Sequence, residues 1–285
     1  MIELRQKLPK IRLKIWLEIS GLPKSSFYEW LQKLNKIDTE ELELVNIIKN
    51  IFEESNKTYG YRRITIGLKK MGIKINHKKV YRIMKENQLK CVKFTRRSRG
   101  YSSFKGEVGK IAENKLNRKF NVASPKTVWV TDITEFKING SDKKLYLSPI
   151  MDLFNSEILS FNLSTSPTVK FATDALDKAL KLLPKEHSLT IHSDQGFHYQ
   201  HVHWVNRLEK RNIRQSMSRR GNCIDNSPME NFFGLLKQEI YYGEKFTSIN
   251  ELENKIVQYI YWYNNKRIKV KLNGMSPIEY RQQAA

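Results

Sequence analysis

The sequence predicts an α/β protein: a mixed five-stranded sheet with flanking helices, preceded by small all-α units. Up to about residue 92 the apolar residues recur at helical spacing, whereas from residue 127 onward β-branched and aromatic runs alternate with helical ones. A mixed α/β layout follows from that alternation. The expected divisions are a helical hairpin similar to a helix-turn-helix (1–36), a second helical unit (37–92), a basic linker (93–122), the core (123–240), and a C-terminal helix with a basic tail (241–285).

The first unit has the pattern helix, break, helix. Gly21, Leu22 and Pro23 interrupt the helical spacing, and Ser26 with Glu29 three residues later forms a capping box that predicts the start of the second helix. This layout fits a helix-turn-helix that contacts DNA. It fits equally a helical hairpin that only packs on its neighbour.

The second unit is expected to contain three helices. Asp38 and Glu41 form another capping box, which predicts a helix start there. A short helix is expected to stop near Gly72, and Asn76 is expected to cap the last helix. The exposed face of that last helix carries four cations, which either line a DNA groove or form a solvated face. These candidate DNA contacts are Lys78, Lys79, Arg82 and Lys85.

The charge of the chain points to a polyanionic partner. There are 51 Lys and Arg against 29 Asp and Glu, a formal net charge of +22. Such an excess is typical of nucleic-acid binding, and a merely Lys-rich composition is the alternative. Basic residues are dense in 93–122, where glycines replace large aliphatic residues, so we expect a linker that follows a phosphate backbone. Candidate contacts there are Arg96, Arg97 and Arg99.

Cysteine and hydrophobicity patterns indicate the compartment. Cys91 and Cys223 lack partners at zinc spacing and are interpreted as free thiols of a reducing environment. We expect no membrane association and a cytoplasmic location, because the sequence has no run of 18 apolar residues and no leader pattern. The histidines at 192–203 lack the partners of a closed zinc site. The tyrosines at 241–263 lack the Arg and His set of a tyrosine recombinase.

The core is expected to alternate strands and helices. Strands are predicted at 127–136, 144–152, 157–163, 188–192 and 213–217. Helices are predicted at 169–183, 202–210, from about 226 onward, and 252–263. Pro228 suits the first turn of the third of these helices, because an N–H is not needed there.

Three carboxylates are the candidate catalytic residues. Asp132 lies in an otherwise hydrophobic strand, where a carboxylate is costly unless it is paired or binds a metal. Asp194 follows a predicted strand, and Glu230 lies in the first turn of a predicted helix. If the two strands are adjacent, three oxygen ligands converge, as a pair of Mg²⁺ ions requires for displacement at phosphorus. Each residue alone also has an ordinary explanation, namely a turn aspartate or a glutamate near the positive end of a helix dipole.

Cations are expected around Glu230. Arg219 and Arg220 lie in the loop before the helix, and Lys237 follows Glu230 by two helical turns. A carboxylate among cations is explained most simply if a metal ion and a polyanion meet there. Arg219, Arg220 and Lys237 are therefore further candidate DNA contacts.

A family resemblance adds to this interpretation. Residues 195–229 separate Asp194 from Glu230, a spacing of 35 residues. That spacing and five blocks resemble the transposases of the insertion-sequence-3 family of bacterial mobile elements, in the retroviral-integrase superfamily. The blocks are WVTDIT at 129–134, HSDQG at 192–196, SMS at 216–218, GNCIDNSPME at 221–230 and YNNKR at 263–267.

The resemblance implies a ribonuclease-H-like core in which Asp132, Asp194 and Glu230 bind two Mg²⁺ ions, with Mn²⁺ as a substitute, and Lys237 lies near the scissile phosphate. It implies DNA cleavage and strand transfer by a homo-oligomer on double-stranded DNA, with the element's terminal repeats and a target as substrates, at the bacterial nucleoid. In this family a frameshift often fuses the chain to an upstream helix-turn-helix product. The alternatives are a non-catalytic DNA-binding regulator derived from a transposase, and a plain nuclease of the same fold.

Overall fold

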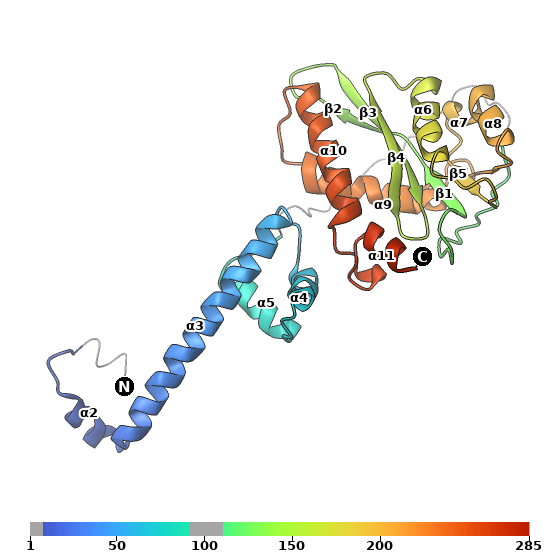
Figure 1. The fold of residues 1–285 in the computed structure, drawn as a ribbon. Helices are drawn as coiled ribbons and strands as arrows, with labels where there is room; N and C mark the ends of the chain where they lie inside the picture. The colour runs from blue at the N-terminus through green and yellow to red at the C-terminus, as the bar shows by residue number, and fades with distance from the viewer. Residues whose placement is uncertain (1–7, 92–110, 285) are drawn as a thin grey trace.

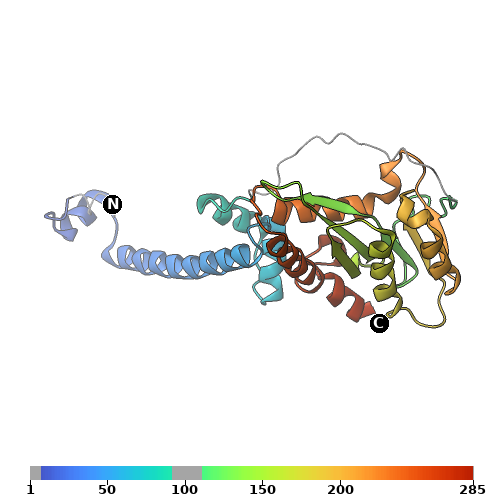
Figure 2. The same cartoon turned by 90° about the horizontal axis from the view of Figure 1, so that it is seen from above.

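The computed structural model describes residues 8–91 and 111–284. Figure 1 shows an N-terminal helical part and a body in which helices flank a sheet. Figure 2 shows that helix α2 and the first half of α3 extend away from the body as an arm. No helix among the described residues combines the length and the apolar character needed to cross a membrane.

The arm confirms the predicted pattern of helix, break, helix. Helix α2 (Leu13–Ser20) ends at Gly21, whose φ of 65° is a left-handed conformation that favours glycine. Helix α3 (Lys24–Glu54) begins directly after Pro23. The predicted start at Ser26 is therefore wrong, because proline already fixes the extended backbone that precedes the first helical turn.

Helix α3 also contradicts the second predicted start. Its 31 residues run without interruption through Asp38, where a new helix was expected. The segment 24–54 contains neither glycine nor proline, so nothing in it stops the backbone hydrogen bonding once it has begun. The boundary expected between residues 36 and 37 consequently falls inside one helix.

The second helical unit packs around the C-terminal half of α3. Helices α4 (Tyr61–Lys70) and α5 (His77–Glu86) follow it. Asn76 caps α5 as predicted, because its side chain accepts the Lys78 N–H at 2.9 Å. Side chains from all three helices form the core of this unit, including Ile48, Phe52, Ile64, Leu68, Val80 and Ile83.

The sheet is mixed, as predicted. Within the described residues it has six strands: β1 (Val128–Thr131), β2 (Thr134–Lys137), β3 (Lys144–Asp152), β4 (Glu157–Ser164), β5 (Thr190–Ser193) and β6 (Arg214–Met217). Strand β4 pairs with one edge of β3, whereas β1 and β2 follow each other along the other edge; all three pairings are antiparallel. Strands β5 and β6 extend the sheet in parallel beyond β1.

The expected five strands become six because the segment 127–136 breaks at Asp132 and Ile133. The Asp132 Oδ1 atom accepts the N–H of Ile133 at 2.7 Å. This local hydrogen bond replaces the pairing that the strand would otherwise make there. Asp132 therefore lies in a gap between two strands, and not within one strand as predicted.

Helices cover both faces of the sheet. They are α6 (Val169–Leu180), α7 (Phe197–Gln200), α8 (Val202–Glu209), α9 (Ser227–Leu236), α10 (Ile249–Asn265) and α11 (Pro277–Ala284), with 3₁₀ turns at Cys223–Asn226 and Val270–Leu272. Helices α6 to α8 pack on one face, which Trp129 enters, and α9 and α10 pack on the other, which Val130 enters. Neighbouring residues of β1 thus serve opposite cores, as strand alternation requires.

Residues from the end of the expected linker and from the C-terminal helix contribute to the core. Residues 93–110 of the expected linker lie outside the described part, but Leu116 is buried and its N–H donates to Ser216 Oγ at 3.3 Å. The C-terminal helix α10 buries Leu252, Ile256 and Ile260 against the sheet. Burial of these apolar side chains holds Leu116 and α10 against the rest of the core.

The helical unit meets the C-terminal segment at a contact that we call the seam. The Ile268 N–H donates to the Tyr59 hydroxyl at 2.7 Å, and Ile268 is part of the core of the helical unit. A Cβ on Gly274 would lie 2.6 Å from Cγ2 of Ile66, so the Gly274 backbone packs directly against the Ile66 side chain. Residues about two hundred positions apart in the sequence thus lie side by side.

Candidate active site

Asp132 and Asp194 come together at the carboxyl ends of two parallel strands. The register of β1 and β5 pairs Val130 with His192. Each aspartate lies two residues beyond its member of that pair, so the side chains leave neighbouring strand ends on the same edge of the sheet. The condition for convergence of the two aspartates, that their strands are neighbours, is therefore met.

The charged form of both carboxyl groups is disfavoured at this site. Asp132 Oδ1 accepts the Ile133 N–H, and Asp194 Oδ1 accepts the Gly196 N–H at 2.9 Å. Burial, and then the charge of Asp194, raise the pKa of Asp132 well above its usual value. Burial also raises the pKa of Asp194. A cation between the two carboxylates would relieve both effects.

Glu230 approaches this pair from helix α9. The helix is fixed to the end of β1, because Asn226 Nδ2 donates to the Thr131 carbonyl at 3.1 Å. Glu230 is the acidic residue of the first turn and is exposed. Its charge also raises the pKa of Asp132, after burial and Asp194, so it acts on the same site.

Lys237 lies at the far end of α9, where the helix continues as a π-helical turn, Lys237–Tyr241. Its Nζ atom lies 5.1 Å from the centroid of the Phe136 ring. Its positive charge lowers the pKa of Asp132, against the larger effect of burial. A cation thus lies close enough to Asp132 to affect its ionisation.

The donor set suits a hard divalent cation. It consists of carboxylate oxygens, the ligands that Mg²⁺ prefers, and two of these carboxylates disfavour each other's charge. In the described part of the chain, no three His, Cys, Asp or Glu side chains lie close enough together to hold a metal ion. The two aspartates at adjacent strand ends form the fixed part of the candidate site.

Comparison with known proteins identifies the family. An integrase core domain model matches residues 122–223, a second model of the same description matches 230–284, and an HTH-like domain model matches 39–99. The putative transposase InsK of insertion sequence IS150 from Escherichia coli is 45% identical over 282 residues, 99% of this chain and 96% of that protein. The chain belongs to the IS3 family of transposases.

Further relatives agree with this assignment. A transposase-like protein of Haemophilus influenzae is 49% identical over 212 residues, 74% of this chain and 95% of that protein. The transposase InsF of insertion sequence IS3A from Escherichia coli is 28% identical over 274 residues, 94% of this chain and 93% of that protein. Among solved structures, the HTLV-2 integrase catalytic core in complex with magnesium has a TM-score of 0.43 and 18% identity, over 55% of this chain and 97% of that one.

Three residues that support the site in this IS3-family transposase escaped the sequence analysis, or were interpreted differently. His192 is buried between two serines, its Nδ1 2.9 Å from Ser216 Oγ and its Nε2 3.1 Å from Ser218 Oγ. Burial lowers its pKa to about 4, so it is neutral at pH 7. Both of its ring nitrogens already contact serines, and the residue thereby joins β5 to β6. Tyr199 is buried beneath the aspartates, with its hydroxyl 3.4 Å from Thr131 Oγ1.

Asp225 is the third of these residues. It is buried, and its carboxylate accepts hydrogen bonds from Asn114, Arg118 and Arg219. The hydrogen bond from Arg219 is the largest cause of its depressed pKa. The signal in the sequence was an acid just after a basic loop, which predicts an internal ion pair as readily as a DNA contact.

The candidate DNA contacts on helix α5 are exposed, but not all are available. Arg82 Nη2 lies 2.9 Å from Glu41 Oε1, and Lys79 Nζ lies 3.5 Å from the other oxygen of Glu41. Within the described ranges, no carboxylate pairs with Lys78 or Lys85. The outer face of α5 therefore presents two unneutralised cations beside two that already contact an acid.

The remaining candidate DNA contacts are divided between the core and the linker. Arg220 is exposed at the loop before α9. The neighbouring Arg219 is also exposed, but its guanidinium is held by Asp225 through both Nε and Nη2. The three linker candidates Arg96, Arg97 and Arg99 lie outside the described residues.

Proposed function

We propose that this IS3-family transposase binds the ends of its mobile element and catalyses metal-dependent phosphodiester cleavage and strand transfer. Asp132, Asp194 and Glu230 are the proposed metal ligands. The observation that supports this most strongly is the pair of carboxylates at adjacent strand ends, with a raised pKa on both. Perturbed carboxyl groups that share a site are typical of catalytic centres.

The side chains have distinct roles in this proposal. Asp132 and Asp194 hold the metal from the fixed edge of the sheet, and Glu230 completes the ligand set from the first turn of α9. Two Mg²⁺ ions, or Mn²⁺ in their place, would supply activation of the attacking hydroxyl and stabilisation of the leaving oxygen. Lys237 contacts the scissile phosphate, since its charge already acts on Asp132. Asn226 keeps α9 against the end of β1.

DNA binding in this proposal uses the basic surfaces of the chain. Lys78 and Lys85 on α5 and Arg220 beside the candidate site are exposed cations suited to phosphate contacts. We expect the chain to act as a homo-oligomer that brings two element ends and a target duplex together, alone or with an upstream reading-frame product. Binding should weaken with salt, by a slope of about −0.9 in log K against log salt for each neutralised phosphate.

The test is cleavage and joining of a labelled duplex that ends in the element's terminal repeat, with Mg²⁺ or with EDTA. Wild type is compared with Asp132→Asn, Asp194→Asn and Glu230→Gln, and with Asp142→Asn as a control in an exposed turn. We expect the first three variants to lose cleavage and joining but to keep DNA binding. The control should retain all three activities.

Two outcomes would favour the alternatives. Tight binding of the duplex without cleavage, even with the upstream-frame product fused to the chain, would indicate a DNA-binding regulator. Cleavage of any duplex without joining, and without need for the terminal repeat, would indicate a plain nuclease. Full activity of one carboxylate variant in Mg²⁺ would remove that residue from the proposed ligand set.

A further inference from the structure

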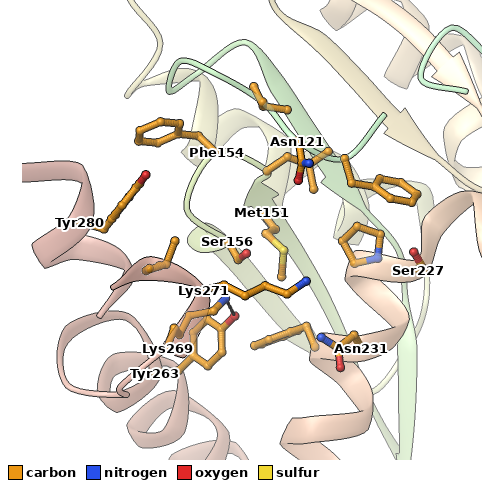
Figure 3. A pocket seen from close by; sticks show the side chains of 16 residues that line it. Asn121, Met151, Phe154, Ser156, Ser227, Asn231, Tyr263, Lys269, Lys271 and Tyr280 are labelled. Carbon is orange, nitrogen blue, oxygen red and sulfur yellow. Dashed lines mark hydrogen bonds between the residues drawn. The ribbon is translucent and has the colours of Figure 1, made fainter. Parts of the chain in front are cut away.

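A cavity of about 530 Å³ lies beside helix α9, separate from the three carboxylates. Figure 3 shows that its walls come from the turn between β3 and β4, the first turn of α9, and the segment that joins α10 to α11. Its volume is in the range of about 300–1,000 Å³ that is usual for ligand pockets. Ser227 and Asn231, which line it from α9, lie on either side of Glu230 in the sequence.

Two lysines give the cavity an unbalanced positive charge. Lys269 Nζ donates to the Tyr263 hydroxyl at 3.0 Å, and Lys271 extends into the cavity (Figure 3). Neither lysine pairs with a carboxylate in the part of the chain that the structure describes. Nearby Arg267 is buried and pairs with Glu239, so the acid that is present already has a partner.

The environment of Lys269 lowers the pKa of its ammonium group. Burial, followed by the charges of Arg267, Lys271 and Arg63, lowers its pKa to about 7. The groups that face it are thus three cations and the Tyr263 hydroxyl. A bound anion would offset the repulsion among these three cations.

The other end of the cavity is aromatic. Phe154 and Tyr280 lie with ring centroids 5.3 Å apart, and both line the cavity. Asn121 and Ser156 add hydrogen-bonding groups near them (Figure 3). Aromatic rings beside amide and hydroxyl groups suit a nucleobase, which stacks through its face and forms hydrogen bonds through its edge.

We propose that this cavity binds one nucleotide of a DNA strand, with its phosphate on Lys269 and Lys271 and its base against Phe154 and Tyr280. That the nucleotide belongs to a DNA strand rests on the proposed function. A free nucleotide or inorganic phosphate would use the same contacts. Because the cavity includes the first turn of α9, its occupation connects binding of the strand to the position of Glu230.

The test measures binding of a 5′-phosphorylated thymidine dinucleotide to the full chain by calorimetry, in EDTA. We expect Lys269→Gln and Lys271→Gln each to weaken binding at least fivefold, and Lys143→Gln, an exposed lysine of another turn, to leave it unchanged. Tyr280→Leu, at the edge of the cavity, should weaken binding without altering the cation cluster. A 5-iodouracil version of the dinucleotide should cross-link to Phe154 or Tyr280.

The pH dependence gives a second measurement on the same samples. Lys269 must be protonated to hold the phosphate, and with a pKa of about 7 it is mostly neutral at pH 8. Affinity should therefore fall about fivefold between pH 6 and pH 8 in wild type, because the roughly tenfold loss of protonated Lys269 is partly offset by the second ionisation of the terminal phosphate, near pH 6. The Lys269→Gln variant should lack this change.

Several results would overturn the proposal. Equal affinity of wild type and both lysine variants would show that the dinucleotide binds elsewhere. Displacement by an equal concentration of inorganic phosphate, without any cross-link, would reduce the cavity to a phosphate site and refute the nucleotide assignment. Since EDTA prevents catalysis, these results leave the carboxylate proposal unaffected. Loss of cleavage in the carboxylate variants likewise leaves the cavity proposal unaffected.

Discussion

Replacement of Asp225 by asparagine tests whether the loop before α9 is held from within the protein. The carboxylate accepts the Asn114 amide at 3.0 Å, Arg118 Nε at 2.8 Å, and three N–H groups of Arg219 at 2.9–3.1 Å. Asparagine has nearly the same shape but only one acceptor oxygen. Its NH₂ group would face donors, so the buried end of the cluster would lose partners.

The magnitude follows from the exposure of each partner. The Asp225 side chain is 0% exposed, whereas those of Arg118 and Arg219 are 43% and 57% exposed. The arginines can therefore regain water, and the main cost is the unsatisfied buried group together with the lost charge-assisted hydrogen bonds. We expect a loss of about 2–4 kcal/mol in the free energy of unfolding. For a core of this size that corresponds to a fall in Tm of about 4–16 °C.

The assay is thermal unfolding at pH 7 and at lower pH, followed by cleavage of the terminal-repeat duplex. The pKa of Asp225 is depressed, so its stabilising effect is full above the usual carboxyl pKa of about 3.9 and is lost as the pH falls towards the folded value. The difference between wild type and variant should thus shrink below about pH 4. Cleavage should fall more than DNA binding, because α9 and Glu230 follow this loop. An unchanged Tm together with unchanged cleavage would refute this account of Asp225.

Three further predictions concern the carboxylate site and its support. Asp132→Asn should raise the Tm of the metal-free protein by about 2–6 °C, since it removes a buried charge beside Asp194, and a lower Tm in EDTA would contradict the repulsion. Gly196→Ala should slow cleavage about tenfold or more, because its Cβ would lie 2.9 Å from Asp194 Oδ1 and would displace that carboxylate. It should cost little stability, because the backbone φ of −61° suits alanine. Gly234→Ala, in open space, is its control, and equal rates for the two variants would contradict the steric argument. The free energy of unfolding should fall by about 3 kcal/mol as the pH falls from 6.5 to 4, because over that range His192 takes up a proton mainly in the unfolded chain. A His192→Gln variant that unfolds with the same pH dependence would exclude His192 as the source.

The sequence predicted the elements that rest on local patterns. Strand β3 spans the residues expected for it, and Asn76 caps α5 as expected. Both features depend only on residues that are close together in the sequence, so the sequence pattern is enough to predict them. That Asp132 and Asp194 each lie in or directly after a strand was visible in the sequence, whereas the parallel pairing of the two strands is given by the structure.

Features that depend on distant residues were not predictable in the same way. The break at Asp132 follows from a hydrogen bond to its own neighbour, which strand propensity does not register. The role of Asp225 depends on Arg118, more than a hundred positions away. Helix α3 continues through Asp38 because a capping pair only permits a helix start, and no breaking residue precedes it.

Because of the seam between the helical unit and the C-terminal segment, the helical unit does not complete its folding first, although it comes first in the sequence. Ile268 completes a core whose other members lie between residues 44 and 89, with Trp262 beside it, so this unit cannot finish folding until the last strands and helices have been synthesised. A fragment that stops before Ile268 would leave that core open at one side. Conversely, a polypeptide cut between residues 91 and 111 would keep its two pieces associated through Tyr59, Ile268 and the Lys70–Glu279 ion pair. A force applied to the helical unit would therefore reach the segment after α10 directly through the seam, without passing along the covalent connection.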